Sequence, residues 1–498
     1  MAVDETFSSL PLDSIADAAL SAASRLGASH ADVRVMSVRT GERVLRDARL
    51  EAASDVREIG LSVRVVHDGS WGFASGITLT PDAAAGIAQQ AVKVAAISRP
   101  LIGSPVELAD EPVHVGEHVS SYRLNPFEVP ESDRVGRLTE LSERLLASPT
   151  VSHVDAVASY VQENTFFASL AGTRTVQQRV RILPTFSVTA VHRGGFDTLR
   201  TVAPPSGRGW EYLTGDGWDF DAEIAELPSQ LAELVEAPDV TAQRADLVID
   251  PTNLWLTIHE SVAHATELDR ALGYEAAYAG TSFATFDQLG SLRYGSELMH
   301  VTGDRVTEHG LATIGWDDEG VAAQSFDIIR DGVLVGYQLN RQMAAERGLG
   351  RSNGCAFADS ARHIPLQRMP NVSLQPLPGG PDTAGLIGQV DDGYYIVGDN
   401  SWSIDMQRYN FQFTGQRWYR IRDGRLAGMV KHGAYQATTT DFWRSMSGLG
   451  GPQTYLLGGA LNCGKGQPGQ VAAVSHGCPS ALFRNVNVLN TEAEGGRA

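Results

Sequence analysis

Cysteine is scarce in this chain, and its scarcity limits where the protein can work. Only Cys355, Cys463 and Cys478 occur among 498 residues. An odd, sparse set excludes a framework of disulfides and favours a reducing compartment. The acidic start of the sequence also lacks the basic-then-apolar order of a secretion signal. We therefore expect a cytoplasmic protein.

Positive charge and long apolar runs are also missing. The formal net charge is -19, and lysine occurs only at positions 93, 431 and 465. A surface this acidic excludes nucleic acid as a direct ligand, because phosphate binding needs a basic face. No stretch approaches the roughly 18 consecutive apolar residues of a membrane span, so we expect no such span.

The residues that are present describe a globular protein with more than one domain. Hydrophobic residues make up 43% of the chain and charged residues 20%, which is ordinary for folded proteins. We predict an α+β region over 1–236, with possible sub-lobes 1–118 and 119–236, and a C-terminal domain over 237–498. The predicted class is α+β: a layered helix-and-sheet region, then a mainly antiparallel β domain that carries one metal-binding helix.

Local patterns place the main elements. Apolar periodicity predicts four helices in the first half, over 12–27, 80–97, 132–146 and 221–236. The stretch 99–130 is rich in proline and predicts a linker or an extended crossing segment. Asp-Gly pairs at 68–69, 331–332, 392–393 and 423–424 predict turns between strands.

The most informative stretch is His259-Glu260-Ser261-Val262-Ala263-His264. It follows Asp250-Pro251, which predicts the cap and first turn of a helix over 251–272. Two imidazoles and a carboxylate suit a zinc hydrolase, which must hold the ion and transfer protons. Histidines five apart lie about 140° apart on an ideal helix, and a single π-turn would align them. The pattern therefore predicts a distorted helix, with two unrelated histidines as the alternative.

A zinc site needs at least a third protein ligand. Glu267 and Asp269 could be ligands, or could orient an imidazole. Cys463 lies in a glycine-rich loop and is the stronger candidate, with Lys465 nearby to favour the thiolate. A rival interpretation groups Cys463, His476 and Cys478 as a separate structural site.

Other features are interpreted as structural. The acidic run Trp316-Asp317-Asp318-Glu319-Gly320 could bind a cation, but we expect a solvated loop between strands. We assign no chemistry to His363, to His432-Gly433 or to His476-Gly477, and we expect structural roles for each.

Several segments of the second half resemble the TldD/PmbA family, also called TldD/TldE. HESVAHATELD at 259–269 is similar to the family's HExxxH helix, although Ala263 stands where the family commonly has glycine. Five further segments follow in the family's order: TSF at 281–283, IGWDDEG at 314–320, IIRDGVLVGY at 328–337, RMPNVSL at 368–374 and NCGKGQ at 462–467. The resemblance is strong in the second half and loose in the first.

This resemblance implies a TldD-like catalytic subunit of a zinc metallopeptidase that acts on unfolded or leader-bearing peptides. It implies His259, His264 and Cys463 as Zn²⁺ ligands and Glu260 as the catalytic base. Glu260 would then take a proton from a zinc-bound water and pass it to the leaving amine.

The resemblance also implies a partner, and it leaves alternatives. We expect a homodimer, or a heterodimer with a PmbA/TldE-like paralogue that lacks the motif. A peptide substrate could bind as an added strand, because the second half is rich in β structure. The alternatives are a non-catalytic partner subunit and a zinc hydrolase of non-peptide amides.

Overall fold

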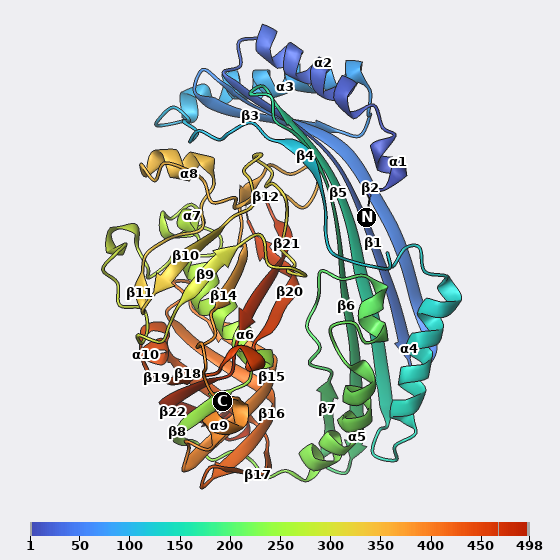
Figure 1. Cartoon of the computed structure of the whole chain (residues 1–498), viewed down its shortest axis with the longest axis vertical. Coiled ribbons are helices and arrows are strands. Elements are labelled where there is room, and N and C mark those ends of the chain that lie inside the picture. The colour runs from blue at the N-terminus through green and yellow to red at the C-terminus, as the bar shows by residue number, and fades with distance from the viewer. Residues whose placement is uncertain (1, 467, 496–498) are drawn as a thin grey trace.

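The two halves of the chain form two parts that lie side by side. The computed structural model describes residues 2–466 and 468–495. Figure 1 shows a long, curved sheet from the first half beside a shorter part built from the second half. Helices combined with mainly antiparallel sheets confirm the predicted α+β class. Within the described residues, no helix is long and apolar enough to cross a membrane.

The first sheet is dominated by four strands of 17 to 19 residues, β1, β2, β5 and β6. The order is β3-β2-β1-β5-β6-β4, with β7 also paired to β6, and every pair except β4–β6 is antiparallel. The strands are β1 (His30–Arg46), β2 (Arg49–His67), β3 (Ser70–Gly76), β4 (Val115–Val119), β5 (His153–Ser169), β6 (Arg174–His192) and β7 (Gly195–Arg200).

Helices pack on the two ends of this sheet (Figure 1). The cluster around α2 and α3 and the cluster around α4 and α5 form separate apolar cores against the strands. The four predicted helices are confirmed, with Thr80 capping α3 as expected. The helices are α1 (Glu5–Ser8), α2 (Leu12–Arg25), α3 (Pro81–Ser98), η1 (Arg99–Leu101), α4 (Glu131–Leu146), η2 (Trp210–Thr214) and α5 (Phe220–Glu236).

The second sheet closes on itself. Strand β15 pairs with both β8 and β16, so the order β15-β8-β22-β18-β16 forms a ring, to which β17 and β19 are added. Many of its apolar side chains, among them Leu247, Phe413 and Phe483, belong to the largest core of the molecule, while Val248, Ile421 and Leu482 form a smaller one. The strands are β8 (Gln243–Ile249), β15 (Asp392–Ile404), β16 (Asn410–Arg422), β17 (Arg425–Val430), β18 (Gly433–Thr438), β19 (Met446–Leu449) and β22 (Ala481–Asn490).

Smaller elements surround this ring. One sheet has the order β11-β10-β9-β14, and β12–β13 and β20–β21 are two-stranded. The strands are β9 (Val301–Asp304), β10 (Ser325–Arg330), β11 (Val333–Leu334), β12 (Ala356–Phe357), β13 (Leu366–Gln367), β14 (Asn371–Leu374), β20 (Leu456–Lys465) and β21 (Gln470–Cys478). The helical segments are α6 (Pro251–Ile258), η3 (His259–Ala263), η4 (His264–Thr266), α7 (Leu268–Ala271), η5 (Phe286–Gln288), α8 (Arg341–Glu346), α9 (Thr383–Ile387), α10 (Thr439–Arg444), η6 (Pro452–Thr454) and α11 (Thr491–Gly495).

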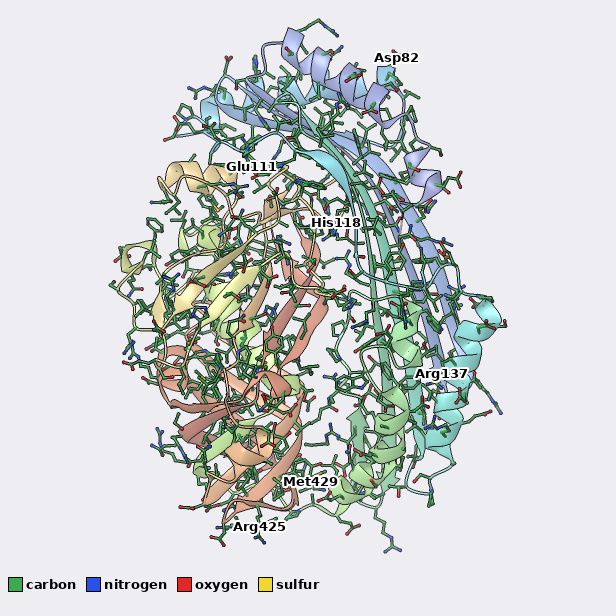
Figure 2. The ribbon with its side chains drawn as sticks, in the orientation of Figure 1. Asp82, Glu111, His118, Arg137, Arg425 and Met429 are labelled. Atoms are coloured by element: carbon green, nitrogen blue, oxygen red, sulfur yellow. The ribbon has the colours of Figure 1, made fainter. Side chains whose placement is uncertain are left out.

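The two parts touch along their length. Figure 2 shows Glu111 and His118, from the segment between α3 and α4, where the long sheet meets the second part. Glu111 accepts a hydrogen bond from Arg351 at 2.7 Å. At the opposite end, Met429 of β17 packs in the core built by α4 and α5. The predicted crossing segment 99–130 therefore runs along a contact between the two parts.

The acidic run at 316–320 is a buried junction, and the prediction of a solvated loop was wrong. Asp318 is bound by Arg34 of β1 at 2.7 Å, and Glu319 by Arg64 of β2 at 3.0 Å. Side-chain cations from a distant sheet neutralise these carboxylates, which makes their burial tolerable. Nothing within the run itself indicates those partners.

Three of the four Asp-Gly turns are confirmed. The pairs at 68–69, 331–332 and 423–424 join antiparallel strands, and all six residues have positive φ, as tight hairpin turns require. The pair at 392–393 instead opens strand β15, so that turn prediction was wrong.

Candidate metal centre

The helix that carries the two histidines contains a π-turn. Asp250 caps α6 through its side chain, and Pro251 is the first helical residue, as predicted. The helix then widens into the π-helical turn η3 over His259–Ala263. This extra residue brings the rings of His259 and His264 onto one side, with their centroids 4.7 Å apart. The predicted distortion is confirmed.

Side chains from other elements bind the backbone of the widened turn. The carbonyl of Ser261 accepts from the Tyr294 hydroxyl, and that of Ala263 accepts from Gln338 Nε2 at 2.6 Å. A π-turn breaks the regular ladder of helix hydrogen bonds, so such partners replace lost ones. Ala263 itself has ordinary right-handed helical angles, φ −64° and ψ −52°, which alanine adopts without strain. Glycine is not required at this position.

The helix does not run unbroken to residue 272, which corrects one prediction. After η4, Glu267 leaves the helical conformation with ψ 118°, and α7 begins at Leu268. This break aims the Glu267 carboxylate back at His264, where Oε2 lies 2.8 Å from Nδ1. Glu267 is thus a partner of an imidazole, the second of the two roles considered for it.

Cys463 lies on a strand, and not in a loop as predicted. It belongs to β20, beside a bulge in the pairing of β20 with β21 between Ala460 and Cys463. Cys463 is 4% exposed, and its Sγ lies 3.7 Å from His264 Nε2. Bulges redirect side chains, and this one faces the widened helix.

The three predicted ligands converge. One donor atom from each of His259, His264 and Cys463 lies within 4.8 Å of the others. A tetrahedral zinc ion with ordinary bond lengths would separate a nitrogen from a sulfur ligand by about 3.6 Å. The observed 3.7 Å between His264 Nε2 and Cys463 Sγ matches that separation. The donor set therefore fits zinc.

A buried cluster of charges supports His264. Lys465 Nζ lies 3.0 Å from Glu267, 2.9 Å from Asp269 and 3.2 Å from Glu275. Burial alone would raise the pKa of Glu267, but Lys465 above all holds it well below its usual range. Asp269, the other carboxylate considered as a ligand, binds Lys465 in this cluster.

His259 is held by a third histidine. Its Nδ1 lies 2.7 Å from Nε2 of His476, which is buried on β21. Cys478 instead points its thiol at the carbonyl of Pro251. Among the described residues, the rival grouping of Cys463, His476 and Cys478 is not brought together as a candidate site.

Glu260 lies beside the candidate ligands and binds an arginine. Its Oε2 accepts from Arg408 Nη1 at 2.8 Å, and both side chains are largely buried. Arg408 has φ +62°, a conformation that costs energy for residues other than glycine. Strained residues cluster at functional sites.

Comparison with known proteins decides the family. The PmbA/TldA metallopeptidase C-terminal domain matches residues 242–490, and PmbA/TldA metallopeptidase domain 1 matches residues 31–95. The chain belongs to the PmbA/TldD metallopeptidase family. The resemblance seen in the sequence is confirmed.

Individual relatives of this PmbA/TldD chain are similar over nearly their whole length. A metalloprotease of Methanothermobacter thermautotrophicus is 27% identical over 470 residues, covering 93% of this chain and 96% of the relative. A protein of Saccharolobus solfataricus named zinc metalloprotease TldD homolog is 21% identical, covering 81% and 85%. The crystal structure of TldE from Thermococcus kodakarensis shares the fold, with a TM-score of 0.70 at 15% identity over 94% of this chain and 98% of that one.

Burial sets the protonation of the candidate ligands in this PmbA/TldD site. It lowers the pKa of His259, and lowers that of His264 well below its usual value, so both imidazoles are neutral at neutral pH. Neutral imidazole is the form that binds metal. Burial also raises the pKa of the Cys463 thiol to about 11, and Arg368 opposes it more than Lys465 does. Lys465 does favour the thiolate, as expected, but burial outweighs its effect on the Cys463 pKa in the metal-free site.

Proposed function

We propose that this PmbA/TldD family chain is a zinc-dependent peptidase that acts on unfolded or leader-type peptides. The observation that carries the proposal is the convergence of His259, His264 and Cys463 beside the Glu260 carboxylate. The zinc in the printed name of the Saccharolobus solfataricus relative supports the choice of ion. The peptide class rests on the family resemblance.

His259, His264 and Cys463 would hold the ion and leave a fourth position open. When bound, zinc supplies Lewis acidity, which polarises a carbonyl and lowers the pKa of a water. Glu260 is adjacent to His259 in the chain and takes the proton from the attacking water, then gives it to the leaving amine. Arg408 occupies Oε2 of Glu260 and so leaves Oε1 to accept that proton.

We propose further that the substrate adds as a strand to β20. Among the described strands, β20 pairs only with β21, so its other edge has no strand partner, and the Cys463 carbonyl accepts instead from the Arg368 guanidinium. A hollow of about 310 Å³ lies next to it, lined in part by Leu461 and Asn462 of β20 and by Tyr160 and Phe357. Main-chain hydrogen bonds would then give affinity with little demand on sequence. A peptide library that reveals strict side-chain requirements at many positions would contradict this mode.

Metal content and two variants test the proposal. Protein purified without a metal-affinity tag should contain about one zinc per chain by elemental analysis. Glu260→Gln should keep the zinc and lose at least about 100-fold in cleavage of short unstructured peptides. Cys463→Ala should lose most of the zinc. The matched control is Glu297→Gln, at an exposed carboxylate, which should change neither quantity.

The same experiments separate the alternative functions. Zinc without cleavage of any peptide, in wild-type protein, would favour a non-catalytic partner subunit. Faster turnover of small amides than of peptides would favour a non-peptide amidase. Wild-type cleavage by Glu260→Gln would show that another group transfers the proton.

We also propose the setting in which the chain acts. It works in the cytoplasm, which suits three free, buried cysteines. It pairs with itself or with a PmbA/TldE-like paralogue, and divides into domains near residue 236. Light scattering of the purified chain, alone and with such a paralogue, tests the pairing, and limited proteolysis tests the boundary.

A further inference from the structure

We propose that His476 is a positioning residue that fixes His259 with its proton on Nδ1 and presents Nε2 to the metal. This role rests on the proposed zinc site, and it adds to that site the group that orients one of its ligands. His476 is on β21, more than 200 residues along the chain from His259, and nothing in the sequence indicates that the two meet.

The hydrogen bonds of His476 determine where its own proton lies. Its Nδ1 is 2.9 Å from the backbone carbonyl oxygen of Val372, on β14. A carbonyl oxygen can only accept, so Nδ1 must carry the hydrogen. A neutral imidazole has one N–H, which leaves Nε2 of His476 as an acceptor.

A doubly protonated His476 is disfavoured by its surroundings. The ring is 0% exposed, and its hydrogen-bond partners are a carbonyl and another imidazole. A buried charge needs an opposite charge or strong hydrogen bonds to be tolerated. Among the described residues, no carboxylate is hydrogen-bonded to His476.

The proton of His259 follows from this. With an acceptor 2.7 Å from its Nδ1, His259 must donate from that atom, and its Nε2 is left unprotonated. His264 is arranged in the same way, with Nδ1 donating to Glu267 and Nε2 facing Cys463. Two different acceptors, an imidazole and a carboxylate, thus select the same tautomer in both ligands.

The ring of His476 is also held in place by packing. Trp255 lies parallel to it, with 6° between the planes and the centroids 6.4 Å apart. Gly458 is paired with His476 across the two strands and makes room for that indole. A Cβ at Gly458 would lie only 2.7 Å from Cβ of Trp255. The acceptor for His259 is therefore rigidly placed, as supporting groups of a metal site need to be.

Two variants at one position separate hydrogen bonding from packing. His476→Phe keeps a ring beside Trp255 and removes the acceptor, so zinc affinity measured by chelator competition should fall about 10- to 100-fold. His476→Gln can place an amide oxygen near the former Nε2 and should recover most of that loss. His363→Phe, at a histidine paired with Asp359 outside the metal site, is the matched control and should bind zinc like the wild type.

A spectroscopic readout is independent of zinc. In metal-free protein with ¹⁵N-labelled histidine, two-bond nitrogen–proton correlations should show His259 in the Nδ1–H form. His476→Phe should convert it to a mixture of tautomers. A pure Nε2–H form of His259 in the wild type would overturn the inference, as would equal zinc affinity of wild type and a folded His476→Phe. Failure of His476→Gln to restore affinity would also overturn it.

The outcomes distinguish this inference from the proposed function. If wild-type protein binds no zinc but shows the Nδ1–H tautomer, the proposed function fails and the positioning role stands. If His476→Phe does not fold, the wild-type tautomer and the zinc affinity of His476→Gln decide the matter.

Discussion

Replacing Lys465 by methionine should strongly destabilise the protein. Lys465 is buried, and its ammonium lies within 3.2 Å of carboxylates of Glu267, Asp269 and Glu275. Its removal leaves Arg270 as the remaining cation of the cluster to balance three buried carboxylates. Removing one partner from a buried ion pair costs about 3–5 kcal/mol, because the other charge stays buried without compensation. We expect a loss in the free energy of unfolding of that size.

The loss should depend on pH in a definite direction. Burial already raises the pKa of Asp269 and Glu275, and Lys465 is the main group that opposes this. Without it both pKa values rise further above those of the unfolded chain. A carboxyl group whose pKa is higher in the folded than in the unfolded chain stabilises the fold at pH values below its unfolded pKa, where it is protonated. That stabilisation is lost as the pH rises through the folded pKa. The deficit of Lys465→Met should therefore be largest in alkali and smaller in acid, where protons replace the missing cation.

The free energy of unfolding of the metal-free protein is measured by denaturant titration, with chelator present, at about pH 8 and about pH 5. The control is Lys93→Met, at an exposed lysine of α3. Exposed charges contribute about 0–1 kcal/mol, so this variant should change stability little at either pH. Equal losses for the two variants, or a Lys465→Met deficit that grows in acid, would refute the reasoning.

Two further predictions concern the metal and the helix that binds it. Zinc binding near neutral pH should release about one proton, since the Cys463 thiol has its pKa raised to about 11 and must ionise, whereas the imidazoles are already neutral. The affinity for zinc should then rise about tenfold per pH unit. Calorimetry in buffers of different ionisation enthalpy measures the proton release, and finding none would contradict this prediction. Gln338→Leu leaves the Ala263 carbonyl without its donor and should lower the free energy of unfolding by about 1–3 kcal/mol, with weaker zinc binding. Denaturant unfolding and zinc titration of Gln338→Leu test this, with Gln389→Leu, at an exposed glutamine, as the control. Equal stability and zinc affinity of the two variants would show that the π-turn does not need Gln338.

The local features of the fold and site were predictable from sequence. Helices α2 to α5, the cap at Asp250 and three hairpin turns depend on neighbouring residues, so short patterns determine them. The π-turn was also predictable, because histidines five apart can face one ion only if the helix widens. The glycine-rich segment around Cys463 identified it as a candidate ligand, although its position on a strand was not predicted.

Partners that come from distant strands were not predictable. His476 and Arg408 reach the site from β21 and from the turn between β15 and β16, and their neighbours in sequence say nothing about His259 or Glu260. The burial of Asp318 depends likewise on Arg34, 284 residues away. The sequence by itself determined the candidate ligand types and the widened helix that aligns them. Only the tertiary structure decided which groups orient, neutralise and bury them, because hydrogen bonds and ion pairs depend on distances in space that the chain order does not record.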